Sequence, residues 1–121
     1  MKYAKWSIMR ANLDPVIGSE QGKSRPVVII SENDINEVLN IVNIIPLTTR
    51  KPNRAIYPNE TFLTGQESGL ENDSIALCHQ IRTIDKKRLS KYYGEITDKT
   101  IRENIVEALC FQLGINCIPG N

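Results

Sequence analysis

The chain has 121 residues and a mass of 13.7 kDa, a length that favours one domain spanning residues 1–121. Hydrophobic residues make up 40% and charged residues 24%, which excludes a disordered chain, a collagen and a coiled-coil rod. The net charge of +1 is below that of a strongly basic nucleic-acid binder, although the placement of charges matters more than their sum. No apolar run approaches about 20 residues, and residues 1–6 hold no apolar signal core, so we expect a cytoplasmic protein.

The cysteines and the histidine predict neither a disulfide framework nor a metal site. Cys78, Cys110 and Cys117 are an odd number, show no C-x-x-C spacing and occur in a chain that we expect to be cytoplasmic rather than secreted. The one histidine, His79, would need carboxylates from distant parts of the chain to complete a zinc site. We therefore expect no metal and no cofactor.

Three strands are predicted in the first half of the chain. Residues 5–13 roughly alternate between apolar and polar side chains, which is typical of a strand with one solvent-exposed face. Residues 27–31 are a β-branched run, which predicts a central strand buried on both faces. After a helical turn within 32–40, residues 41–48 predict a third strand, in which Pro46 indicates an edge position or a bulge near the end.

Shorter elements are predicted in the second half. Residues 60–64 and 74–81 read as strands, with an acidic turn region at 65–73 between them. Residues 82–91 form a basic segment, and 92–96 a last extended piece. On strict alternation His79 falls on the same face as Ile75, Leu77 and Ile81, which predicts a packed histidine.

The clearest single element is a helix that ends before Gly114. Thr97 or Asp98 is suited to cap its N-terminus, and Gly114 to end it. Its apolar side chains recur at helical spacing: Ile101, Ile105, Ala108, Leu109 and Leu113. The tail 115–121 should be loose. Together the elements predict a mainly β protein with helices (α+β), in which a small twisted antiparallel sheet, open or closed into a barrel, carries the C-terminal helix.

The polar loop before the central strand holds the densest set of chemical groups. It carries the hydroxyl of Ser19, the carboxylate of Glu20, the amide of Gln21 and the guanidinium of Arg25. Arg25 precedes a proline at the mouth of a buried strand, so its charge is either paired with Glu20 or directed at a ligand. Phosphate is the obvious ligand, because the guanidinium fork matches its oxygens.

Over roughly residues 4–115 the chain resembles the MazF/PemK family of toxin endoribonucleases. The segments that carry the resemblance are N-L-D-P (12–15), G-S-E-Q-G (18–22), R-P-V-V-I-I-S (25–31), P-L-T-T (46–49) and L-C-H-Q-I-R-T-I-D-K (77–86). The G-S-E-Q and R-P stretch is the specific part, and the rest agrees in order and spacing. The resemblance implies an SH3-like barrel with added helices, shared with the gyrase poison CcdB.

The family also implies a function: the toxin of a type II toxin–antitoxin pair, a homodimeric, metal-independent endoribonuclease that cuts single-stranded RNA at short motifs. Its catalytic arginine, threonine and glutamate match Arg25, Thr48 and Glu20. The substrate-binding positions that the resemblance implies here are Ser19, Gln21, Thr49, His79 and Gln80. The implied partners are RNA and a cognate antitoxin, with no membrane. His79 stands where the family usually has an acidic residue, which leaves the proton acceptor open.

The chemistry of RNA cleavage without a metal is consistent with these residues. The 2′-OH is the nucleophile, and the reaction needs a base, an acid and positive charge on the phosphorane. Arg25 suits charge stabilisation, and Thr48 can hydrogen-bond a phosphate oxygen, although a strand-end threonine can equally be a surface residue. Glu20 and His79 are the competing bases.

Two further interpretations remain open on sequence alone. The basic segments 50–54 and 82–91 either track the RNA backbone or are solvated loops. The aromatic candidates near the sheet for base stacking are Trp6, Tyr57 and Phe62, of which Trp6 and Phe62 also suit the core. The alternative functions are a CcdB-like toxin that binds and poisons a topoisomerase without cleaving anything, and an inactive family member.

Overall fold

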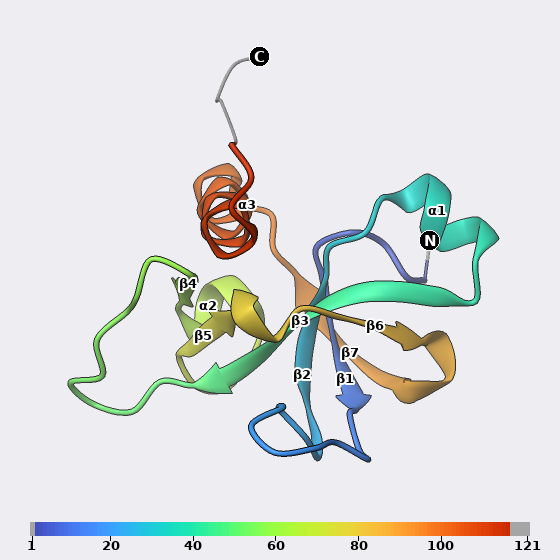
Figure 1. Cartoon of the computed structure of the whole chain (residues 1–121), viewed down its shortest axis with the longest axis horizontal. Helices are drawn as coiled ribbons and strands as arrows, with labels where there is room; N and C mark the ends of the chain where they lie inside the picture. The colour runs from blue at the N-terminus through green and yellow to red at the C-terminus, as the bar shows by residue number, and fades with distance from the viewer. Residues whose placement is uncertain (1, 117–121) are drawn as a thin grey trace.

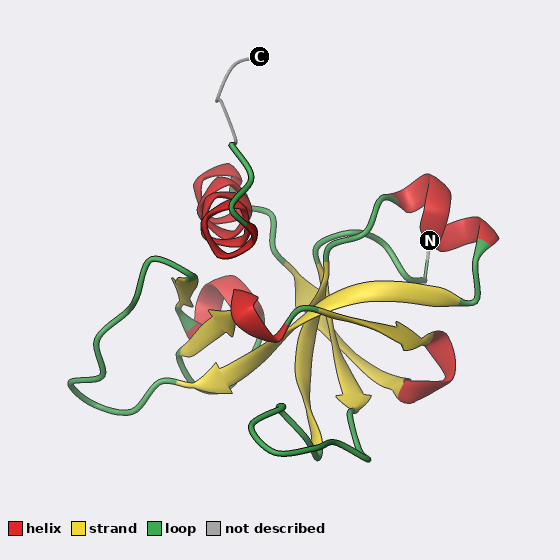
Figure 2. Ribbon diagram, viewed as in Figure 1, coloured by secondary structure: helices red, strands yellow, loops and turns green. Residues whose placement is uncertain are grey.

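The apolar runs of the first half of the chain become the centre of a twisted antiparallel sheet in a computed structural model that describes residues 2–116 (Figures 1 and 2). The strands of this part are β1 Ser7–Asn12, β2 Ser24–Ile29, β3 Ile41–Thr49, β4 Glu60–Leu63, β5 Ser74–Leu77, β6 Arg82–Asp85 and β7 Leu89–Glu95. The helices are α1 Asn33–Val38, α2 Gly65–Ser68 and α3 Lys99–Leu113, with 3-10 turns η1 Cys78–Gln80 and η2 Lys86–Arg88.

The strands are ordered β4-β5-β3-β2-β1-β7, and β6 also pairs with β3. The pairings between them are antiparallel, as the sequence predicts. β3 is a central strand, so the edge position suggested for Pro46 is wrong. Pro46, opposite Val27, is instead the last residue of β3 that pairs with β2. From Leu47 onward β3 pairs with β5. A residue without an N–H suits this change of partner.

Apolar side chains cover both faces of the central strands. Val28 and Ile45 pack on the face that α3 covers, together with Ile8 and Ile105. Val27, Ile29 and Ile44 pack on the other face in a second cluster. The β-branched run of β2 is therefore buried on both sides, as predicted, because neighbouring residues of a strand point to opposite faces.

Helix α3 begins and ends where the sequence predicts. The Asp98 side chain accepts a hydrogen bond from the N–H of Ile101 at 3.0 Å, and Gly114 takes the left-handed conformation, with φ 66°, that ends the helix. Ile105 and Ala108 are its buried residues, and they face β4 and η1. The part of the expected tail from 117 to 121 lies outside the described residues.

The second half of the chain differs from the prediction in one important place. The strand expected over 74–81 ends at Leu77, and η1 follows, closed by the N–H of Ile81 donating to the carbonyl of Cys78 at 3.3 Å. The basic segment 82–91 is not a plain loop, because it contains β6 and the first half of β7. Within residues 2–116, no helix is long and apolar enough to cross a membrane.

Candidate functional site

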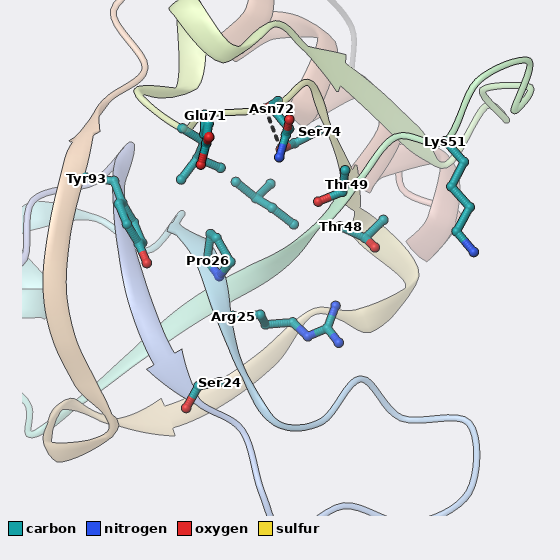
Figure 3. Close-up of a pocket in the computed structure, with 12 residues that line it drawn as sticks. Ser24, Arg25, Pro26, Thr48, Thr49, Lys51, Glu71, Asn72, Ser74 and Tyr93 are labelled. Carbon is teal, nitrogen blue, oxygen red and sulfur yellow. Dashed lines mark hydrogen bonds between the residues drawn. The ribbon is translucent and has the colours of Figure 1, made fainter.

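Arg25 and Thr48 meet at one end of the two central strands. The β2–β3 ladder ends at Val27 opposite Pro46, and Arg25 and Thr48 each lie two residues beyond this last pair, on strands that start to diverge there. Both side chains line an open depression of about 520 Å³, shown in Figure 3, together with Thr49 and Lys51. Two positions 23 apart in sequence therefore share one site, as the resemblance implies.

The guanidinium of Arg25 is held at its inner nitrogen only. Its Nε donates to the carbonyl of Gly22 at 2.9 Å, and no other described residue forms a hydrogen bond or ion pair with it. The Arg25–Glu20 ion pair does not form, because the Glu20 carboxylate turns back to accept the N–H of Ile17 at 2.7 Å. Both Nη groups of Arg25 are thus available to an anion in the depression.

A second depression of about 450 Å³ gathers Ser19, Glu20, His79 and Gln80. The amide of Gln80 ties its two walls together: its Oε1 accepts from the N–H of Gln21 at 3.0 Å, and its Nε2 donates to the carbonyl of Ser19 at 3.2 Å. The candidate residues therefore form two groups. Arg25, Thr48 and Thr49 line one depression, and the loop residues with His79 and Gln80 line or border the other.

His79 is exposed, so the prediction of a packed histidine is wrong. The reason is η1, which breaks the alternation of β5 after Leu77 and turns Cys78 inward and His79 outward. Cys78 takes the buried place, where burial raises the pKa of its thiol to about 12. That thiol is therefore protonated at neutral pH and unsuited to act as a nucleophile. Cys110 is disulfide-bonded, a bond that the odd number and the spacing of the cysteines did not predict.

The basic segment 50–54 is largely occupied by internal contacts. Arg54 donates through both Nη groups to the Glu60 carboxylate, at 2.8 and 2.7 Å. This hydrogen-bonded pair lowers the pKa of Glu60 below its ordinary value and raises that of Arg54. Arg50 donates to the carbonyl of Arg54 and lies 4.8 Å from the ring centroid of Phe62. Lys51 is the basic residue of this segment that lines the Arg25 depression.

Two arginines of the segment 82–91 hydrogen-bond the backbone at the start of the polar loop. Arg82 donates to the carbonyl of Leu13 at 3.0 Å, and Arg88 donates to the carbonyls of Asn12 and Asp14 at 2.9 and 2.6 Å. These contacts fix the exit of β1, where the loop begins. The alternative of a plain solvated loop is wrong for these two side chains, which hydrogen-bond the backbone of the neighbouring loop.

Sequence reasoning missed two chemically distinct residues of the Arg25 depression, Glu71 and Tyr93, whereas Lys51 belongs to the basic segment 50–54 that it singled out. These two come from the α2–β5 loop and from β7, segments with no catalytic motif of their own. Only the closing of the sheet brings them beside Arg25, so no local pattern could have identified them.

The antiparallel sheet with its C-terminal helix, and the half-buried Arg25 and Thr48 that line one depression, define a small mainly β protein with a polar site suited to an anionic ligand. The model of the PemK-like, MazF-like toxins of type II toxin–antitoxin systems matches residues 4–113, so the chain belongs to this family. It is 37% identical over 105 residues to Endoribonuclease EndoA of Bacillus subtilis (strain 168), covering 87% of this chain and 89% of that protein.

Solved structures share the fold at lower sequence identity. MazF from Deinococcus radiodurans superposes with a TM-score of 0.77 at 23% identity, over 93% of this chain and 96% of that chain. An endoribonuclease in complex with its cognate antitoxin from Mycobacterial species gives 0.75 at 23% identity, over 95% and 98%. The predicted mainly β architecture with a C-terminal helix is therefore confirmed. The chain is a toxin-family protein and an endoribonuclease homologue.

Proposed function

We propose that this chain is a sequence-selective, metal-independent endoribonuclease that cleaves single-stranded RNA. The observation that carries the proposal is that Arg25 of β2 and Thr48 of β3 line the same open depression, with both Nη groups of Arg25 available to an anion. A relative named as an endoribonuclease, at 37% identity, supports the enzyme over a topoisomerase poison.

The proposed reaction is an internal displacement at phosphorus. The 2′-oxygen attacks the adjacent phosphate, its proton passes to a base, and the P–O5′ bond breaks as the 5′-oxygen takes up a proton. The products are a 2′,3′-cyclic phosphate, which can open to a 3′-phosphate, and a 5′-hydroxyl. Negative charge grows on the phosphorane oxygens, where Arg25 would stabilise it and Thr48 would donate a hydrogen bond.

For the base we propose Glu20, which belongs to the same loop as Arg25. In this structure its carboxylate lines the neighbouring depression and is held by Ile17, so RNA binding must bring it to the 2′-OH. His79, the competing base, is exposed in that same depression, so burial does not count against it. The pH dependence of cleavage separates the two.

The remaining polar residues are proposed to bind the RNA strand. Thr49 extends the wall beside Thr48, and Ser19, Gln21, His79 and Gln80 border the loop depression. We also propose a homodimer, a cognate antitoxin as partner and a cytoplasmic location. The proposal of an antitoxin is supported by the related structure solved in complex with one.

A cleavage assay tests the function directly. Purified protein is incubated with a mixed pool of naked RNA in EDTA, and the fragment 5′ ends are sequenced. We expect cuts at a short motif, with 5′-hydroxyl and cyclic-phosphate ends. Intact RNA, together with inhibition of a purified topoisomerase by the same preparation, would establish the binding toxin instead.

A further inference from the structure

The depression that holds Arg25 and Thr48 extends well beyond them. At about 520 Å³ it falls within the range of small-molecule sites, roughly 300–1,000 Å³, and exceeds what one phosphate group needs. In Figure 3, Tyr93 and Glu71 lie on the far side of Pro26 from the Arg25 guanidinium. The depression thus has a cationic end and a second end of different chemistry.

The second end combines an aromatic ring with hydrogen-bonding groups. Tyr93 and Leu70 are half-buried side chains that pack against the core and also line the depression. The exposed Glu71 and Asn72 stand beside them and offer a carboxylate and an amide. A flat apolar surface with acceptors and donors at its margin suits a nucleobase, which has a π-face and a polar edge.

The backbone around this second end is held by close contacts. Gly69 ends α2 with φ +74°, and a Cβ placed there would lie 2.6 Å from the carbonyl oxygen of Tyr93. The α2–β5 loop is fixed at Asp73, whose side chain accepts from the N–H of Gly65 at 3.0 Å and whose carbonyl accepts from Arg50 at 2.9 Å. The backbone that carries Glu71 and Tyr93 is therefore positioned before any ligand arrives, which lowers the cost of binding.

We propose that the Tyr93–Glu71 end of the depression is a base-recognition subsite for the nucleotide next to the cleaved phosphate. This inference rests on the proposed function. The base lies against the Tyr93 ring, and the Glu71 carboxylate accepts hydrogen bonds from amino or imino N–H groups on its edge. Tyr93 and Glu71 are thus specificity-determining residues for one position of the cleaved motif.

The experiment compares cleavage motifs and rates across variants. Wild type, Tyr93→Ala, Tyr93→Phe and Glu71→Gln are each incubated with the same mixed RNA pool, and the 5′ ends are sequenced. Tyr93→Ala should weaken the preference at one position next to the cut and lower kcat/KM on the best substrate roughly tenfold or more. Tyr93→Phe should keep the preference, because the ring remains. Glu71→Gln should change the preferred base at that same position, because an amide adds a donor.

Two neighbouring residues give matched controls. Tyr92 is on the same strand but is 57% exposed and lines a different depression, so Tyr92→Ala should leave the motif and rate unchanged. Glu37 is an exposed carboxylate on α1, away from the site, so Glu37→Gln should behave likewise.

The outcomes separate this inference from the function beneath it. If wild type cleaves and both Tyr93→Ala and Glu71→Gln keep its motif, the subsite is wrong and the endoribonuclease assignment stands. If wild type leaves RNA intact, the proposed function fails and the subsite fails with it. If Tyr93→Ala fails to fold, Glu71→Gln alone decides, since Glu71 is exposed in a loop. A variant that changes the mass of the protein in solution but not the motif shows that this end is a protein interface, which also overturns the inference.

Discussion

The side chain of Gln80 holds the backbone of Gln21, 59 positions away, because its Oε1 accepts a hydrogen bond from the Gln21 N–H at 3.0 Å. Its Nε2 donates a second hydrogen bond to the carbonyl of Ser19. Together with Arg82 and Arg88, which brace the exit of β1, this amide fixes a loop that is otherwise exposed over residues 17–20. The loop that carries the family motif is therefore positioned by η1 and by the segment 82–88, in addition to its own internal hydrogen bonds.

Replacing Gln80 with alanine should loosen this loop. We expect faster backbone hydrogen exchange over residues 17–22 and a drop of about tenfold in cleavage, because loop misplacement weakens a positioned site. The control is Gln66→Ala on the surface of α2, outside both depressions. Unchanged exchange in the Gln80 variant would show that the amide does not hold the loop.

Replacing Arg25 with alanine should remove cleavage while the protein stays folded. The guanidinium is anchored only at Nε, so its loss costs little packing, whereas a lost transition-state contact typically costs about 10²–10³ in rate. Single-turnover cleavage and thermal unfolding are measured together. Arg10→Ala, on the exposed side of β1, is the matched control. Near-normal activity of a folded Arg25→Ala protein would falsify the assignment.

The acid limb of the pH–rate profile should identify the base. If Glu20 accepts the proton, His79→Gln keeps the activity and the acid limb of wild type, while Glu20→Gln loses most of its activity. If the imidazole accepts it, wild-type activity falls on the acid side because an imidazolium cannot accept a proton, and His79→Gln abolishes that limb. We expect the first result. Activity in both variants would assign the proton to water or another group.

The buried Glu60 should make stability depend on pH on the acid side. Arg54 keeps the pKa of this carboxyl below its ordinary value of 4.5, so its contribution is present above that pH and is lost as the pH falls further. Urea unfolding from pH 6 to pH 3 should show this loss, and Glu60→Gln should reduce it. At pH 7, Arg54→Met should lower the free energy of unfolding by about 1–3 kcal/mol, because it leaves a buried carboxylate unpaired. An equal effect from Arg10→Met at pH 7 would contradict the role of the pair.

The protein should be a dimer in solution. On helix α3 the apolar side chains of Val106, Phe111 and Leu113 are between 40% and 66% exposed. Exposed apolar surface of this kind is typical of a protein–protein interface. Light scattering at micromolar concentration should give about twice the chain mass of 13.7 kDa. A mass equal to one chain at every concentration would contradict the dimer.

The sequence by itself determined the elements whose signals are local. The β-branched run of β2 and the helical spacing, cap and glycine stop of α3 each depend on neighbouring residues, and each lies close to where it was predicted. The specific G-S-E-Q and R-P segments indicated the family, and the family model confirms it. These elements form where they are predicted because hydrophobic periodicity and helix capping depend on residues only a few positions apart.

Only the tertiary structure decided where the side chains lie relative to one another. The η1 turn reversed the expected burial of His79, the Arg25–Glu20 pair gave way to bonds with Gly22 and Ile17, and the basic segments became internal struts. Tyr93 and Glu71 reached the Arg25 depression from segments with no motif. Each of these outcomes depends on contacts between residues far apart in sequence. The energies of those contacts decide which of several locally possible side-chain positions and hydrogen-bond partners is adopted.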